Sequence, residues 1–145
     1  MKTHLSLPTS DLAKSVRFYA TLLDERPAKQ FDDYALFIAE RPGLELALGV
    51  AQFASPTPDT HYGIVVESAA AVETAIERLE RAGLVSSIER DETCCYARQT
   101  KVWAVDPDGR QWEVYTVHED TDERGVSDPT CCAEDSGACC AQAPT

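Results

Sequence analysis

Two adjacent cysteines, Cys94 and Cys95, lie in the stretch ETCCYARQTKVW between two strand-like runs. Adjacent Cα atoms are ~3.8 Å apart, closer than ordinary disulfide geometry allows, so such a pair tends to remain as two thiols. Two neighbouring thiols suit trivalent arsenic in R–As(OH)₂, because thiolates can displace both hydroxyls while the carbon–arsenic bond remains. A structural zinc site would need four ligands, and this stretch offers only two. The alternative is that both cysteines are simply small residues in a turn.

Two histidines and one glutamate have a strand phase that separates them from their apolar neighbours. His4, His61 and Glu113 each stand next to a large apolar residue in a strand-like run. The apolar side chains can therefore face a core while these three face the other side of a sheet. Two imidazoles and one carboxylate from separate strands form the facial triad of non-haem Fe(II) enzymes, which leaves one face of the metal open. For each histidine taken alone, a hydrogen-bonded structural role is the alternative.

The elements that must position these residues occur twice along the chain. Each copy reads as one strand, one helix and three further strands, and His4 and His61 both lie in the first strand of their copy. Ser10 or Asp11 is expected to cap the first helix and Ser68 the second. The expected strands are residues 3–7, 28–31, 34–39 and 44–50 in the first copy and 61–66, 86–91, 101–105 and 112–117 in the second.

This repeat predicts an α+β fold in which two βαβββ modules form a curved mixed sheet, a half-barrel around a metal site. The modules are expected at about residues 1–53 and 60–118, which together make one domain. Residues 119–145 are polar, acidic and nearly free of large apolar side chains, so we expect a disordered tail. The tail carries further cysteine pairs, which could capture a soft metal or metalloid or could be incidental: Cys131, Cys132, Cys139 and Cys140.

Charge and hydropathy limit the expected partners. The 145 residues carry a formal net charge of −12 and no basic stripe, which argues against nucleic acid and anionic membranes. No apolar run approaches membrane-spanning length, and the stretch MKTHLSLPTSDL lacks the apolar region of a signal peptide. We therefore expect a cytoplasmic protein whose six cysteines are reduced thiols.

The repeated modules, the strand-borne His4, His61 and Glu113, and the stretch TCCYARQTKVWAVDPDGRQWEVY resemble the carbon–arsenic lyases over roughly residues 1–117. These enzymes belong to the vicinal oxygen chelate superfamily, together with glyoxalase I and the extradiol dioxygenases. The resemblance implies Fe(II) bound by His4, His61 and Glu113, and a trivalent methyl or aromatic arsenical held by Cys94 and Cys95. It also implies that dioxygen is the co-substrate for cleavage of the carbon–arsenic bond to give arsenite.

Several alternatives stay open at this point. Lys101 is a candidate for a catalytic group near the reacting centre or a solvated strand lysine. A glyoxalase I-like isomerase would use a fourth metal ligand, for which Glu45 is suitably placed, although that chemistry does not call for a thiol pair. A cadmium- or arsenic-sequestering protein is the second alternative, because cadmium-induced proteins look similar over the same span. Modules in this superfamily close within one chain or swap between two, so both a monomer and a homodimer are compatible.

Overall fold

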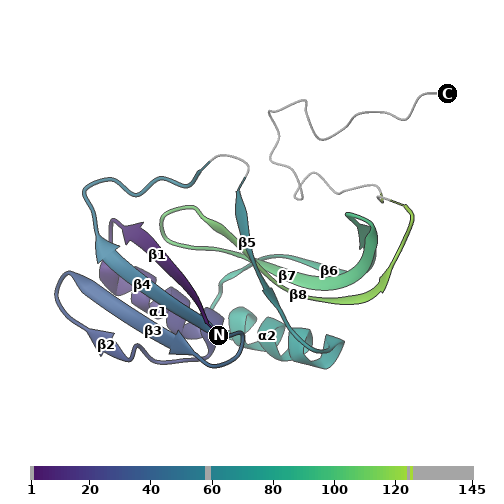
Figure 1. The fold of residues 1–145 in the computed structure, drawn as a ribbon, viewed down its shortest axis with the longest axis horizontal. Helices are drawn as coiled ribbons and strands as arrows, with labels where there is room; N and C mark the ends of the chain where they lie inside the picture. The colour runs from purple at the N-terminus through teal and green to yellow at the C-terminus, as the bar shows by residue number, and fades with distance from the viewer. Residues whose placement is uncertain (1, 58–59, 124, 126–145) are drawn as a thin grey trace.

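The computed structural model describes residues 2–57, 60–123 and 125, so most of the acidic tail and its cysteine pairs lie outside the described residues. Figure 1 shows two modules, each with a sheet and one helix. The strand–helix–three-strand repeat predicted from the sequence is confirmed. Its elements are β1 (Thr3–Thr9), α1 (Leu12–Leu23), β2 (Lys29–Gln30), β3 (Tyr34–Ala39) and β4 (Leu44–Val50), then β5 (His61–Val65), α2 (Ala69–Arg81), β6 (Val85–Cys94), β7 (Ala97–Val105) and β8 (Gln111–Asp120).

Each module forms its own four-stranded sheet, with the order β1-β4-β3-β2 in the first and β5-β8-β7-β6 in the second. The first and last strands of each module pair in parallel, and the other pairs are antiparallel. Helix α1 packs against β3 and β4, and α2 packs against β6, β7 and β8, so one face of each sheet has no helix over it in the described part of the chain. The expected fold class is confirmed, although within one chain the curved sheet is divided into two.

Both helices begin at a capping side chain and turn an apolar stripe toward their sheets. Asp11 accepts a hydrogen bond from the Lys14 N–H, and Ser68 accepts one from the Ala71 N–H. Neither helix in the described residues is long and apolar enough to cross a membrane. The buried residues recur at helical spacing and close one core with the inward faces of the strands: Leu12, Phe18, Tyr19, Leu22 and Leu23 in α1, and Val72, Ala75, Ile76 and Leu79 in α2.

The strands around the cysteine pair are longer than predicted. β6 runs to Cys94 and β7 begins at Ala97, so Cys94 and Cys95 lie at the tip of a β-hairpin. β8 extends to Asp120, past the expected end of the domain at residue 118. These added segments are polar and lack the alternation of apolar residues that a sequence pattern can detect. Pairing of their backbones with neighbouring strands forms them instead.

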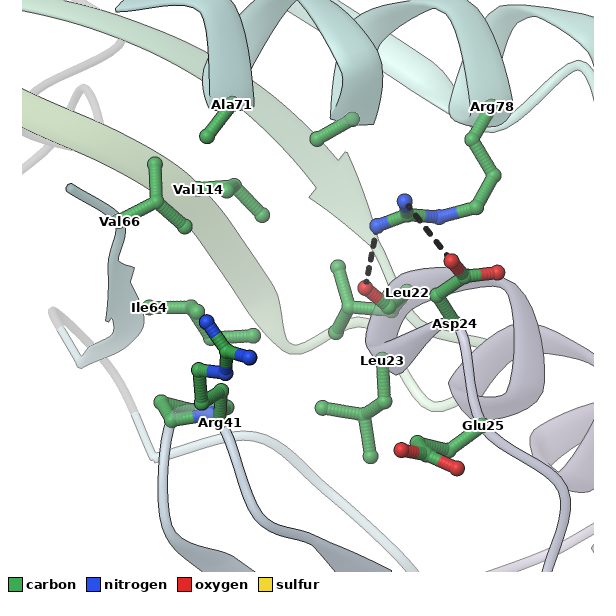
Figure 2. A pocket seen from close by; sticks show the side chains of 12 residues that line it. Leu22, Leu23, Asp24, Glu25, Arg41, Ile64, Val66, Ala71, Arg78 and Val114 are labelled. Carbon is green, nitrogen blue, oxygen red and sulfur yellow. Dashed lines mark hydrogen bonds and ion pairs between the residues drawn. The ribbon is translucent and has the colours of Figure 1, made fainter. Parts of the chain in front are cut away.

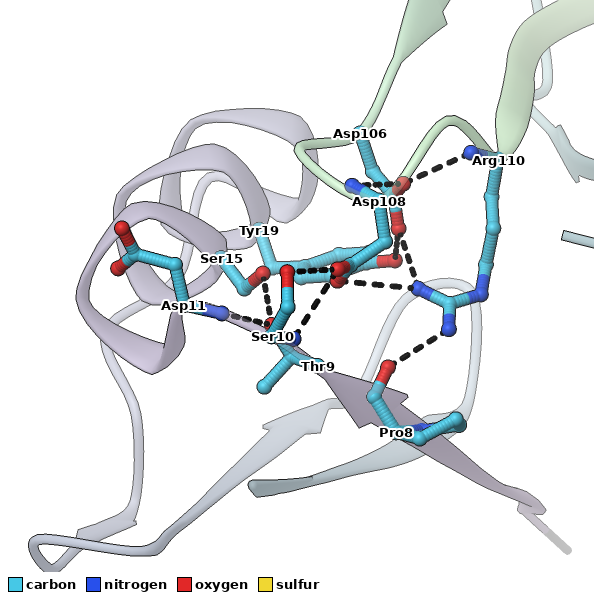
Figure 3. Close-up of polar contacts among 9 residues, drawn as sticks. All are labelled: Pro8, Thr9, Ser10, Asp11, Ser15, Tyr19, Asp106, Asp108 and Arg110. Carbon is cyan, nitrogen blue, oxygen red and sulfur yellow. Dashed lines mark hydrogen bonds and ion pairs between the residues drawn. The ribbon is translucent and has the colours of Figure 1, made fainter. Parts of the chain in front are cut away.

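The turn between β7 and β8 fastens the second module to the first (Figure 3). Arg110 is buried and donates hydrogen bonds to Asp106 (2.9 Å) and to a carbonyl of β1 (2.6 Å). Tyr19 of α1 donates to Asp106 at 2.6 Å, and burial together with this bond raises the pKa of Tyr19, so the phenol remains a donor. Ser10 donates to Asp108 through its N–H (3.0 Å) and its hydroxyl (2.6 Å). The DPDG stretch forms the turn between β7 and β8 and also joins the two modules.

Candidate active site on the second sheet

The helix-free face of the second sheet carries charged and aromatic side chains from all four strands. In the sheet register Glu113 lies opposite Trp103, and Lys101 lies between Tyr115 on one side and Glu89 on the other. Alternate side chains of a strand share a face, so these residues project away from α2, while Val102 and Trp112 point into the core. We call this group the open-face cluster: His61, Glu89, Lys101, Trp103, Glu113 and Tyr115.

Within the open-face cluster, His61 and Glu113 form a close pair. His61 Nε2 lies 3.5 Å from Glu113 Oε1, and their side chains are 47% and 9% exposed. The imidazole stands edge-on to the Trp103 ring, with centroids 5.2 Å apart. Gly63 allows this approach, because a Cβ at that position would lie 3.1 Å from Glu113 Oε1 and 2.9 Å from a ring carbon of Tyr115. The pair therefore combines a buried carboxylate with an imidazole that solvent or a ligand can reach.

Lys101 is buried, which overturns the alternative of a solvated strand lysine. Its Nζ lies 3.2 Å from Glu113 Oε2 and 4.0 Å from Glu89 Oε2. Glu89 is buried as well and accepts a hydrogen bond of 2.8 Å from Trp103 Nε1. One ammonium between two carboxylates leaves an excess negative charge beside His61, which favours a cation there. The sequence pattern did not identify Glu89, because its place opposite Lys101 depends on a strand register with a bulge.

A single chain brings together only part of the metal-ligand set expected from the sequence. Among the described residues, Glu113 Oε2 receives no well-directed hydrogen bond although Lys101 Nζ is close, so this carboxylate retains acceptor capacity. His4 lies on the first sheet, where its Nδ1 is 3.7 Å from Glu45 Oε2 of the neighbouring strand. No three His, Cys, Asp or Glu side chains of the described residues gather to hold a metal. The structure thus brings together two of the three expected ligands and places the third with Glu45.

The cysteine pair sits on a tight turn. Cys95 and Tyr96 form the two-residue loop of the β6–β7 hairpin, and both have positive φ values, 55° and 66°. Two-residue hairpin loops with positive φ at both positions normally contain Asn or Gly. A cysteine and a tyrosine at these positions are therefore strained, and strained backbone of this kind is typical of functional sites. The two sulfur atoms are 3.1 Å apart without a disulfide, with Cys94 buried and Cys95 exposed. One soft atom can contact both sulfurs in this arrangement.

A cavity of about 280 Å³ lies on the helix-covered side of the second sheet, between α1, α2 and β5 (Figure 2). Arg78 of α2 borders it and donates hydrogen bonds to the carbonyls of Thr21 (2.6 Å) and Leu22 (3.1 Å) at the end of α1. These bonds satisfy helix-terminal carbonyls, which gives Arg78 a structural role. Of the described residues that line this cavity, none is a predicted site residue. The chemistry-bearing side chains lie on the open sheet face instead.

Comparison with known proteins identifies the superfamily of the chain and the fold that it shares with solved structures. The model of the glyoxalase/bleomycin resistance protein/dioxygenase superfamily matches residues 3–114. A solved structure of such a protein from Alicyclobacillus acidocaldarius has a TM-score of 0.65 with 18% identity, covering 82% of this chain and 92% of its own. The fosfomycin resistance protein FosX from Listeria monocytogenes gives a TM-score of 0.61 with 17% identity over 79% of this chain and 90% of its own. At these identities the likeness concerns the fold.

Curated relatives are more similar in sequence. The trivalent organoarsenical cleaving enzyme of Bacillus sp. (strain MD1) is 37% identical over 91% of this chain and 83% of its own length. The protein of the same name from Thermomonospora curvata is 39% identical over 94% and 92%. The cadmium-induced protein CadI of Mycobacterium bovis is 40% identical over 86% and 81%. The chain therefore belongs to the glyoxalase/bleomycin resistance protein/dioxygenase superfamily, the vicinal oxygen chelate superfamily that its sequence resembles.

Proposed function

We propose that this protein cleaves the carbon–arsenic bond of trivalent organoarsenicals such as methylarsenite and trivalent aromatic arsenicals, with dioxygen as co-substrate and arsenite as product. The observation that carries the proposal is the pair of sulfur atoms of Cys94 and Cys95, which lie 3.1 Å apart at a hairpin tip. Relatives named trivalent organoarsenical cleaving enzyme, at 37% and 39% identity, support it. A glyoxalase I-like isomerase is the less favoured enzyme, because that chemistry has no use for a thiol pair.

The two thiols would bind the substrate by ligand exchange. R–As(OH)₂ and two cysteine thiols give R–As bound to two sulfurs plus two molecules of water, and the organic group stays on arsenic. Both protein sulfurs come from one hairpin turn, so the second As–S bond forms within an already tethered complex. Cys95 is exposed and Cys94 is buried beneath it, so we expect Cys95 to react first and Cys94 to close the chelate.

Fe(II) is the metal that we propose, and it would supply the dioxygen chemistry that side chains cannot perform. His61 and Glu113 would hold it on the second sheet, and His4 would be the third ligand. Lys101 would fix the buried Glu113 carboxylate in place, and Trp103 would restrain the His61 ring. Lys101 is thus a positioning residue here, in place of the catalytic role that the sequence suggested.

We propose that a second copy of the chain supplies His4. β1 and β5, which carry His4 and His61, are both edge strands of their sheets. The faces that carry the two histidines are also those that no described helix covers, which leaves them open to another molecule. A homodimer in which the first sheet of one copy faces the second sheet of the other would combine two such half-sites.

Mixing two inactive variants tests this arrangement. His4→Ala and His61→Ala each remove one ligand, so each homodimer should be inactive. A mixed dimer has one site with both mutations and one with neither, so co-expression should restore about a quarter of the wild-type rate of arsenite release per chain for random pairing. Absence of recovery, in a mixture shown to form mixed dimers, would mean that each site is built within one chain.

Arsenite release from methylarsenite tests the function itself. Replacing both Cys94 and Cys95 by serine should lower the rate at least ~100-fold, because the substrate is no longer tethered. The matched control is the Cys131→Ser/Cys132→Ser variant, which removes an adjacent pair from the tail and should keep most of the rate. Equal rates for the Cys94/Cys95 variant and the wild type would rule out the proposed substrate site.

Sequestration of soft metals is a second candidate function, favoured by the 40% identity to CadI and by the six cysteines. A sequestering protein binds its metalloid stoichiometrically and releases no product. Incubation of the iron-loaded protein with excess methylarsenite in air separates the two functions. More than one arsenite per chain supports the enzyme, whereas bound methylarsenite without arsenite supports sequestration.

A further inference from the structure

A buried amide holds the cysteine turn from inside the hairpin. Gln99 lies on β7, is 7% exposed, and donates a hydrogen bond of 2.9 Å from its Nε2 to the carbonyl of Cys94. The side chain thus crosses the hairpin and ties the residue before the turn to the strand after it. Buried side-chain amides of this kind are costly unless their hydrogen bonds are made, so the contact is a strong constraint on both partners.

A second hydrogen bond holds the other side of the same turn. The backbone N–H of Thr121, just after β8, donates to the carbonyl of Tyr96 at 2.8 Å. Cys95 and Tyr96 between these anchors have φ values of 55° and 66°, a region that is unfavourable for residues other than Gly, Asn and Asp. Without the two hydrogen bonds to Cys94 and Tyr96, relaxation of the turn to negative φ values would be favourable. The two hydrogen bonds oppose that relaxation and keep the sulfur atoms 3.1 Å apart.

We propose that Gln99 is a positioning residue that prearranges Cys94 and Cys95 for two-point binding of a trivalent arsenical. This inference rests on the proposed function, because it assigns the thiol pair to the substrate. A ligand that binds both sulfurs gains from a turn that is already in the bound conformation, since less ordering remains to be done. A reagent that reacts with one sulfur gains nothing from this geometry. Gln99 should therefore control chelation by arsenic and leave single-thiol reactivity almost unchanged.

The parent protein for the test is the full chain with serine at the tail cysteines, so that Cys94 and Cys95 are its only thiols: Cys131→Ser, Cys132→Ser, Cys139→Ser and Cys140→Ser. Gln99→Leu removes the donor at similar size, and Gln111→Leu is the control on the exposed end of β8. The probe is phenylarsine oxide, titrated by the change in thiol absorbance. Loss of one buried hydrogen bond should raise the dissociation constant about tenfold in Gln99→Leu and less than about twofold in the control. N-ethylmaleimide, which needs one thiol, should react at rates within about twofold in all three proteins.

A compensating substitution separates positioning from a general loss of stability. Tyr96→Gly places the residue that prefers positive φ at the second turn position, and Tyr96 is 53% exposed, so its removal disturbs little packing. In the Gln99→Leu background, Tyr96→Gly should recover most of the lost affinity for phenylarsine oxide. A protein weakened only by a poorer core would gain no arsenical affinity from this change.

The outcomes distinguish this inference from the proposed function. Equal affinity of the folded Gln99→Leu variant and its parent for phenylarsine oxide would overturn the positioning role while leaving substrate binding intact. If the parent protein binds phenylarsine oxide more tightly than Gln99→Leu but no variant releases arsenite, the positioning role would stand and the proposed reaction would be overturned. A parent that fails to bind phenylarsine oxide would overturn both.

Discussion

Lys101 is the residue on which the open-face cluster depends. Its ammonium group is the buried positive charge between Glu89 and Glu113, at 4.0 Å and 3.2 Å. The rings of Trp103 and Tyr115 lie 5.5 Å and 5.9 Å from Nζ, at distances where an aromatic face attracts a cation. Both neighbouring carboxylates are buried together with this lysine. The side chain therefore links the stability of the sheet to the position of the proposed metal ligand.

Removal of this charge should be costly. Lys101→Met leaves two buried carboxylates without their shared cation, and we expect the free energy of unfolding to fall by about 3–5 kcal/mol. Urea denaturation followed by circular dichroism measures it, with Lys29→Met on the exposed β2 as the control. Adding Glu89→Gln to Lys101→Met removes one of the stranded charges and should recover part of the loss. If Lys101→Met were as stable as its control, the ion pairs of Lys101 would make no net contribution to the free energy of unfolding.

At the scale of elements, strand alternation predicted that His61 and Glu113 share a sheet face, and the structure agrees on that placement. Alternation could not predict Glu89 beside Lys101, because register shifts between β6 and β7 break the simple correspondence of positions. Strand alternation also could not predict how far His4 lies from His61 and Glu113. That distance depends on how two modules pack, which no pattern within one strand encodes.

Gly63 gives an element-scale prediction about the parallel pair β5 and β8. Gly63→Ala introduces a Cβ that meets Tyr115 at 2.9 Å and Glu113 at 3.1 Å, so the carboxylate must move. We expect an approximately tenfold weaker affinity for Co(II), used as a stable substitute for Fe(II) in calorimetric titration, and a stability loss of about 1–3 kcal/mol. Gly49→Ala on β4 is the matched control, because its Cβ would meet nothing within 4 Å. Equal Co(II) affinity in both variants would show that the absence of a side chain at Gly63 has no effect on metal binding.

At the scale of the molecule, the repeat supplies each module with one histidine–glutamate pair, His4–Glu45 and His61–Glu113. The sequence repeat predicted both modules because strand and helix periods are local properties. It did not predict the joint at Asp106–Arg110, because a DPDG turn reads the same whether its carboxylates face water or another module. This joint fixes how the two sheets of one chain sit, and so which faces remain open to a second copy.

The joint should make stability depend on acid pH. Burial alone would raise the pKa of Asp108, but the hydrogen bonds from Ser10 and the charge of Arg110 outweigh it and lower the pKa. A lowered carboxyl pKa contributes stability that is present above the unfolded value of ~3.9 and is lost as pH falls through the folded pKa. Asp108→Asn should therefore cost about 1–2 kcal/mol at neutral pH, and the difference from wild type should shrink in acid. Asp32→Asn, in an exposed loop, is the control for the loss of one carboxylate.

Dioxygen consumption measured together with arsenite release tests the central claim most directly. For methylarsenite the atoms balance as CH₃As(OH)₂ + O₂ → HCHO + As(OH)₃. The iron-loaded protein should consume one dioxygen for each arsenite and each formaldehyde formed, and should form no arsenite without air. The Cys94→Ser/Cys95→Ser variant should consume no substrate-dependent dioxygen. Arsenite formed at an unchanged rate in the absence of dioxygen, or with both thiols removed, would contradict the account.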